Sequence, residues 1–175
     1  MNKWIFSLIQ FFPLSTFAWF AFWNGFPTVE RWLLAFQLGA VLGMIQLSVL
    51  LPQKNPLNRL VLAGNIYLIL GGLAVYLKQW WYLQIYDSLR ESGIILLMAL
   101  VGLASTFMTR TGFIAVDGGE RKYSFWLLFA TLSMLPFAIY FEGNRIYAAV
   151  LPIIFLAFVQ RYISFLAKKE VLAET

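Results

Sequence analysis

Hydrophobic residues along this chain are gathered into six long runs, separated by short polar segments. The runs cover residues 4–23, 32–51, 60–77, 93–108, 123–141 and 146–166. Each is close to the roughly 20 residues that an α-helix needs to cross about 30 Å of hydrocarbon. The pattern predicts an all-α polytopic membrane bundle of about six transmembrane helices, because a helix satisfies its own backbone polar groups in lipid.

The third polar link, residues 78–92, is long for a connection between two helices. Trp81 and Ile85 lie on one stripe of a helix drawn through it, with tyrosines beside them, whereas Gln84 and Asp87 lie opposite. Apolar and aromatic residues on one side and polar residues on the other are typical of a helix lying in the membrane interface. We therefore expect a short interfacial helix in this loop.

Composition supports a single integral membrane domain over residues 1–175. The chain is 61% hydrophobic and only 12% charged, whereas a soluble domain has about 25% charged residues. Histidine and cysteine are both absent, which removes the commonest metal ligands and the commonest general base at neutral pH. We expect no metal, no cofactor and no catalytic residue, so a non-catalytic role is favoured over an enzyme.

The distribution of basic residues predicts the orientation. The side that would hold both termini carries nine of them: Lys3, Lys54, Arg59, Arg110, Arg121, Lys122, Arg161, Lys168 and Lys169. The other side carries four: Arg31, Lys78, Arg90 and Arg145. Cytoplasmic loops collect Lys and Arg, so we expect both termini in the cytoplasm. The net charge of +5 then reflects membrane topology, and no nucleic-acid partner is expected.

The second run suggests how the helices pack. Gly39, Gly43 and Gln46 fall within about 60° of each other on a helix, and small or polar residues are the usual contacts between helices in lipid. Gln37 and Ser48 lie on the opposite face. We expect this helix to contact neighbours on both sides.

The cytoplasmic loop 109–122 is the strongest candidate for a partner- or ligand-binding site. It combines three basic residues, two acidic residues and three glycines, and acidic residues oppose simple anchoring to an anionic leaflet. Arg110, Asp117 and Arg121 are the candidate binding residues, and the apolar run 113–116 is expected to dip into the membrane interface. The alternative is an ordinary positively charged loop with a turn.

Arg161 is the remaining candidate, because it lies inside the sixth run. Its long side chain can reach the cytoplasmic headgroups. If it instead points into the bundle, it becomes an anchor for an anionic ligand. No acidic or basic residue lies at the middle of any run, which argues against a proton pump.

Three short segments resemble the bacterial septation protein A family of inner-membrane proteins. They are Phe11-Phe12-Pro13-Leu14, Phe17-Ala18-Trp19-Phe20 and Gly71-Gly72-Leu73. The resemblance implies a cell-envelope protein that works through other membrane proteins. It assigns no functional residue, and the loop 110–122 departs from the pattern expected of that family.

Two functions follow as hypotheses. The first is a non-catalytic multi-pass protein that associates with other cell-envelope membrane proteins or with a second copy of itself, within the lipid bilayer. The second is a small transport or solute-binding module for a neutral or aromatic compound. The chain is similar in size and predicted number of spans to the substrate-binding subunits of energy-coupling-factor vitamin importers, which supports the second only at the level of the fold.

Overall fold

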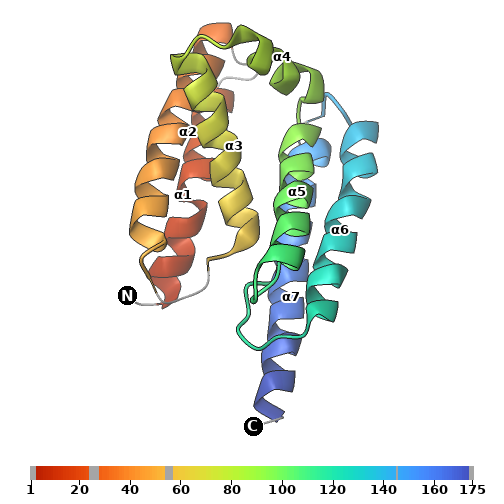
Figure 1. Ribbon diagram of the computed structural model, residues 1–175. Helices are drawn as coiled ribbons and strands as arrows, with labels where there is room; N and C mark the ends of the chain where they lie inside the picture. Colours follow the sequence, from red (N-terminus) through yellow and green to blue (C-terminus); the bar gives the residue numbers. More distant parts are fainter. Residues whose placement is uncertain (1–2, 24–27, 54–56, 145, 174–175) are drawn as a thin grey trace. The chain divides into compact units, whose positions relative to one another are not determined.

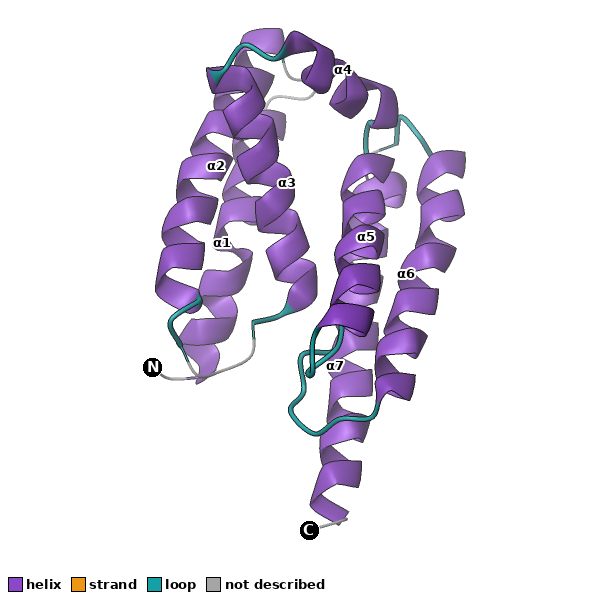
Figure 2. Ribbon diagram, in the orientation of Figure 1, coloured by secondary structure: helices purple, strands orange, loops and turns teal. Residues whose placement is uncertain are grey.

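The computed structural model describes all residues except 1–2, 24–27, 54–56, 145 and 174–175. Its elements are α1 Lys3–Phe22, α2 Val29–Leu50, α3 Arg59–Tyr76, α4 Trp80–Leu89, α5 Ser92–Met108, α6 Arg121–Tyr140, the π-helix η1 Ile146–Val150 and α7 Leu151–Ala173. The described part contains helices and no strand (Figure 2). The all-α prediction is therefore confirmed. Two residues used in the charge analysis, Lys54 and Arg145, lie outside the described residues.

Residue contacts divide the chain into two compact units. Unit 1 comprises Met1–Lys54 and Gly64–Ser88, and unit 2 comprises Asn55–Ala63 and Leu89–Thr175. Unit 1 holds α1, α2, most of α3 and α4, and unit 2 holds α5, α6, η1 and α7 (Figure 1). The prediction of one integral domain stays a prediction.

An aromatic cluster joins the helices of unit 1. The fully buried Phe36 of α2 lies with its ring centroid 4.9 Å from Phe17 of α1, 6.0 Å from Tyr67 of α3 and 5.4 Å from Tyr86 of α4. The Tyr86 hydroxyl donates a hydrogen bond of 2.9 Å to the Tyr67 carbonyl oxygen. Each such aromatic pair contributes about 0.5–1.5 kcal/mol beyond the burial of its surface. Four helices of unit 1 therefore share one centre.

The closest approach between α2 and α3 occurs at a pair of adjacent glycines. A Cβ atom on Gly71 would lie 2.4 Å from Cδ1 of Phe36. A Cβ atom on Gly72 would lie 2.3 Å from the Cβ of Ala40 and 2.8 Å from the carbonyl oxygen of Phe36. Only glycine fits at these positions, so the backbones of the two helices come close together here.

The packing face predicted for α2 lies against the same neighbour. Gly39, Gly43 and Gln46 are all buried, and a Cβ on Gly43 would lie 3.5 Å from the side-chain oxygen of Asn65. The Asn65 side-chain amide donates a hydrogen bond to the Gln46 side-chain oxygen. An amide pair of this kind holds helices together in lipid, where neither group can find water.

The opposite face of α2 is not covered within its unit. Gln37 and Ser48 are both exposed, so the expectation of a second packed face stays a prediction. The Ser48 hydroxyl donates a hydrogen bond of 2.9 Å to the Met44 carbonyl oxygen of its own helix. A serine satisfied in this way needs no neighbouring helix.

Unit 2 is built from α5, α6 and α7. The π-helix η1 precedes α7, and Pro152 at the second position of α7 cannot donate the hydrogen bond that would continue a regular helix backward. Together η1 and α7 run over Ile146–Ala173, 28 residues, or about 42 Å of helix. This length exceeds the hydrocarbon thickness of about 30 Å. The C-terminal end of α7 extends past the neighbouring end of α6 (Figure 1).

Four helices in the described residues are long and apolar enough to cross a membrane: α2, α3, α6 and η1 with α7. The count becomes five if the bent pair of α4 and α5 forms one span. Nine of the 20 side chains of α1 lie outside the described residues. Helix α5 alone has 17 residues. The count of six spans stays a prediction.

The end of α3 gives a prediction about backbone strain. Lys78 has a φ of 54°, and around it the Gln79 amide donates to the Ala74 carbonyl and the Lys78 amide to the Val75 carbonyl. This is the Schellman arrangement, in which glycine usually occupies the left-handed position. We expect Lys78→Gly to raise the unfolding free energy by about 1 kcal/mol, measured by denaturation in mixed micelles.

A glycine inside the same helix is the matched control. Tyr76→Gly should lower the unfolding free energy by about 1 kcal/mol, because glycine is costly within a helix. A loss of stability in Lys78→Gly would contradict the assignment of strain to this position.

Candidate functional site

The loop of residues 109–120 between α5 and α6 is packed into unit 2 (Figure 2). Its apolar run is buried within the protein: Phe113 is 0% exposed, Ile114 2%, Ala115 7% and Val116 4%. The expectation that this run dips into the membrane interface is therefore wrong. The four side chains form a plug inside unit 2, and lipid is not needed to cover them.

Phe113 occupies a space left by a missing side chain on α5. A Cβ on Gly102 would lie 2.5 Å from Cε1 of the Phe113 ring, so the ring packs directly against the α5 backbone. Thr106, one turn farther along, is buried and donates its hydroxyl to the Gly102 carbonyl at 2.7 Å. The absence of a side chain at Gly102 thus makes room for the phenyl ring.

Hydrogen bonds connect the loop to α3, α6 and α7. The Phe113 amide donates to Ser124 Oγ of α6 at 3.0 Å, and Ser164 Oγ of α7 donates to the Ile114 carbonyl at 3.5 Å. At the start of α3, Arg59 Nη2 donates to Thr111 Oγ1 at 3.4 Å. These bonds satisfy polar groups that accompany the apolar run into the interior.

Tight turns shape the backbone at both ends of the plug. Gly112 and Gly118 have φ values of +61° and +73°, which glycine adopts at little cost. A Cβ on Gly112 would also lie 2.1 Å from Ser124 Oγ. Ala115 has a φ of 56°, and an alanine in this region stores strain of about 1–2 kcal/mol. The loop is therefore held in one defined conformation.

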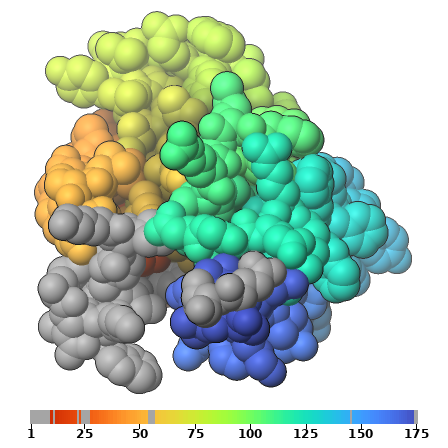
Figure 3. Space-filling view, turned by 60° about the horizontal axis from the view of Figure 1, so that its bottom comes forward, coloured from red at the N-terminus to blue at the C-terminus, as the bar shows by residue number. Residues whose placement is uncertain are grey.

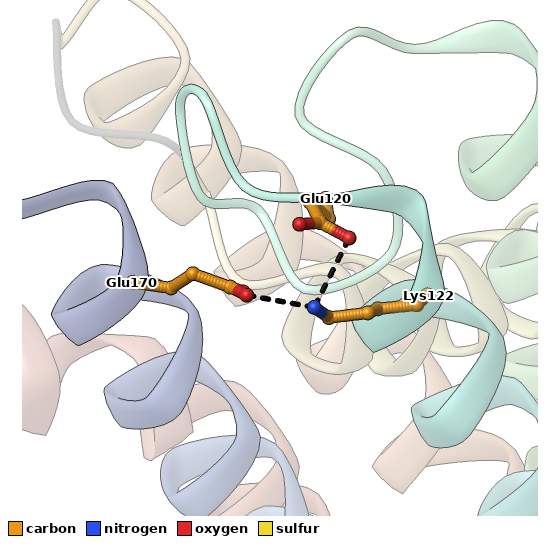
Figure 4. Close-up of polar contacts among 3 residues, drawn as sticks. All are labelled: Glu120, Lys122 and Glu170. Atoms are coloured by element: carbon orange, nitrogen blue, oxygen red, sulfur yellow. Dashed lines mark hydrogen bonds and ion pairs between the residues drawn. The ribbon is translucent and has the colours of Figure 1, made fainter. Parts of the chain in front are cut away.

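A charged cluster joins the end of the loop to α7. Lys122 Nζ lies 3.1 Å from Glu120 Oε2 and 2.7 Å from Glu170 Oε1, between the two carboxylates (Figure 4). It also lies 5.1 Å from the centroid of the Tyr123 ring. The loop and the start of α6 lie against the C-terminal part of α7 in the space-filling view (Figure 3). These contacts hold the projecting end of α7 beside the loop.

The cluster favours the charged form of both partners. Hydrogen bonding from Lys122 holds the pKa of the Glu170 carboxyl below its ordinary value of 4.5. Hydrogen bonds to Glu170 and Glu120 raise the pKa of the Lys122 ammonium group. Lys122 precedes the predicted span 123–141, and Glu170 follows the predicted span 146–166, so both groups are placed to meet water.

We expect Glu170→Gln to lower the melting temperature slightly at neutral pH, because the pair is partly exposed and screened. The carboxylate's contribution is complete above pH 4.5 and is lost as the pH falls through the lowered pKa of the folded protein. The difference between wild type and Glu170→Gln should therefore vanish in acid, measured by thermal denaturation in detergent.

Glu142→Gln serves as the control for that experiment, because Glu142 is an exposed carboxylate just past the other end of α6. Its difference from wild type should be close to zero at every pH. A Glu170→Gln difference that stays constant down to pH 3 would contradict the ion pair.

The residues predicted for this site are placed on its outer surface. Arg110, Asp117 and Arg121 are all exposed. Arg161 is also exposed on α7, so it does not point into the interior of unit 2. The structure thus presents these side chains to the surroundings, and no buried pocket assembles around them.

Two contributors were missed by sequence reasoning. Glu170 is 48 residues from its partner Lys122, and Arg59 is 52 residues from Thr111. A signal for the first was present: antiparallel neighbouring helices with a short connection bring the start of one beside the end of the other. The contact of Arg59 had no comparable signal.

The described residues contain no group of three or more acidic side chains placed to hold a metal ion. The absence of a cofactor and of catalytic residues stays a prediction. Comparisons with protein-family models, with curated proteins and with solved structures find no match to this chain. The resemblance to the septation protein A family therefore also stays a prediction.

Proposed function

We propose that this chain is a non-catalytic, six-span protein of the bacterial inner membrane that acts by associating with other membrane proteins of the cell envelope. Its cytoplasmic loop 109–122 supplies the specific contact surface. The bilayer is its solvent, and both termini lie in the cytoplasm.

The exposed surfaces of the long helices support a membrane location. Only 28% of the apolar window of α6 and 22% of that of η1 with α7 is buried. On α6 the outward residues include Phe125, Trp126 and Phe129, which are 45%, 68% and 74% exposed. Apolar surface on this scale is costly in water, whereas it matches the acyl chains of a bilayer.

The six-span topology adds α1 and α5 to the four long apolar helices. Their 20 and 17 residues correspond to about 30 Å and 25 Å of helix, which is within the range for a span with modest mismatch. Reporter fusions after residues 54, 117 and 169 should all give a cytoplasmic signal, because the basic residues divide nine to four. A periplasmic signal at any of them would contradict the six-span map.

The observation that carries the association hypothesis is the packing of the loop. Its apolar run 113–116 is buried in unit 2, while Arg110, Asp117 and Arg121 are exposed around it. A surface with both charges on a fixed backbone binds with less loss of conformational entropy than a flexible loop. An ordinary positively charged loop would need neither the buried plug nor the acidic residue.

Complementation in the native host tests this surface. Arg110→Ala, Asp117→Ala and Arg121→Ala should each reduce activity while the protein still accumulates in the membrane. Lys169→Ala is the matched control, because Lys169 is an exposed cation on the same side but outside the loop. Arg121→Lys separates recognition from anchoring, since lysine keeps the charge but lacks the planar fork of arginine.

Full activity of all three alanine variants would contradict the proposed surface. Full activity of Arg121→Lys together with loss in Arg121→Ala would show that charge alone is needed there, as in anchoring to anionic lipid.

A further inference from the structure

Helix α4 presents three different faces along its 10 residues. Tyr86 is buried in unit 1, where its ring centroid lies 4.6 Å from that of Tyr67. Trp81 and Ile85 are 63% and 43% exposed and form a separate apolar stripe. Asp87 is exposed in the third direction, with Trp80 on the same side of the helix. At 100° per residue these directions are about 120° apart.

This arrangement refines the amphipathic pattern read from the sequence. Tyr86, beside the apolar stripe, is the residue that packs α4 into unit 1. The stripe itself stays exposed, and the partners of Trp81 are its chain neighbours Gln79 and Tyr82. The exposed tryptophan and isoleucine add nothing to the packing of α4 on its own unit, and exposed apolar surface is unfavourable in water. The stripe of Trp81 and Ile85 therefore needs a medium that is neither bulk water nor the interior of the protein.

The depth of α4 identifies that medium. Its Tyr86 hydroxyl reaches the carbonyl of Tyr67, which precedes the end of α3 at Tyr76 by nine residues, or about 13 Å of helix. A tyrosine side chain is shorter than this. The α4 backbone therefore lies beside the C-terminal half of α3. Because α4 begins at Trp80, four residues after α3 ends, its start lies near the boundary where a span of 18 residues leaves the hydrocarbon.

The polar atom of Trp81 is already satisfied at this depth. Its indole Nε1 donates a hydrogen bond of 2.8 Å to the side-chain oxygen of Gln79. The ring can then enter a region of low water content without leaving an unpaired donor. Tryptophan is the residue most characteristic of the boundary between headgroups and acyl chains.

We propose that α4 is a lipid-binding anchor that inserts Trp81 and Ile85 into the outer-leaflet interface, while Asp87 faces water and Tyr86 holds the helix to unit 1. The occupant of the exposed stripe is the lipid surface. This inference rests on the proposal that the chain spans a membrane, but it concerns a different surface from the cytoplasmic loop.

The absence of cysteine from the sequence permits a direct test by single-site spin labelling. Ile85→Cys, Trp81→Cys and Asp87→Cys would each carry a nitroxide, in vesicles of phosphatidylethanolamine and phosphatidylglycerol. Phe129→Cys on α6 is the control for a span, because Phe129 is 74% exposed near the middle of that helix. Accessibility to oxygen, which concentrates in lipid, is compared with accessibility to a water-soluble nickel chelate.

Labels at 81, 85 and 129 should be several-fold more accessible to oxygen than to the chelate, and the label at 87 should show the reverse. If 129 behaves as expected but 85 is accessible to the chelate, the α4 inference fails and the span proposal stands. If 129 is accessible to the chelate, the span proposal itself fails and the inference with it. A label at 85 shielded from both reagents would mean that protein covers the stripe, which also overturns the inference.

Discussion

Gly72→Ala is expected to destabilise the protein more than any other single added methyl group in α3. The new Cβ would lie 2.3 Å from the Cβ of Ala40 and 2.8 Å from the carbonyl oxygen of Phe36. Backbone atoms of α2 cannot rotate away as a long side chain can, so the two helices must separate. Overpacking of this kind costs about 3 kcal/mol, and the displacement of Phe36 also disturbs the aromatic cluster of unit 1.

Gly64→Ala on the same helix is the matched control. The nearest atom to its new Cβ would be Leu14 Cδ2 at 3.8 Å, an ordinary van der Waals distance. Alanine is the better helix former by about 1 kcal/mol, so this variant should be as stable as wild type or slightly more so. Unfolding in mixed micelles, followed by circular dichroism, measures both. Equal effects of the two substitutions would contradict the close approach at Gly72.

The second large effect is expected from Phe113→Ala in the loop. The Phe113 side chain is fully buried against the backbone of Gly102, and its removal leaves a cavity that this backbone cannot fill. Phenylalanine-to-alanine substitutions at such sites cost about 3–5 kcal/mol. The loop should lose its fixed conformation, and with it the activity that depends on Arg110, Asp117 and Arg121.

Phe129→Ala controls for the loss of a phenyl ring as such. Phe129 is 74% exposed on α6, and surface substitutions usually change stability by less than about 0.5 kcal/mol. Limited proteolysis of the loop, together with unfolding in mixed micelles, distinguishes the two variants. A loop that stays resistant to protease in Phe113→Ala would contradict its role as the centre of the plug.

The helices were predictable from the sequence because a long apolar run enters lipid, where no water is present. A helix satisfies the backbone polar groups of such a run within the segment itself. Their ends were less predictable. The second run begins at Trp32, whereas α2 begins at Val29 because Thr28 caps it by accepting a hydrogen bond from the Arg31 amide. The sixth run ends at Leu166, whereas α7 continues to Ala173, since a helix does not stop where its apolar residues do.

Contacts between distant residues were harder to predict for a physical reason. A glycine shows that close approach is allowed, but not where it occurs. Gly39 and Gly43 were identified from their spacing, yet the tightest contacts between α2 and α3 fall at Gly71 and Gly72. The positions of Phe36 and Ala40 on the neighbouring helix decide this. A run of four apolar residues likewise reads the same whether lipid or protein covers it, so the burial of 113–116 was missed.

Native mass spectrometry of the protein extracted in mild detergent from its own membranes tests the association hypothesis most directly. The chain has a mass of 20.1 kDa. We predict a stable complex between this chain and a different membrane protein, lost when Arg110, Asp117 and Arg121 are together replaced by alanine and retained in Lys169→Ala. A free 20.1 kDa chain, a complex of identical copies alone, or a chain carrying only a bound small molecule would contradict it, and the last result would favour a solute-binding module.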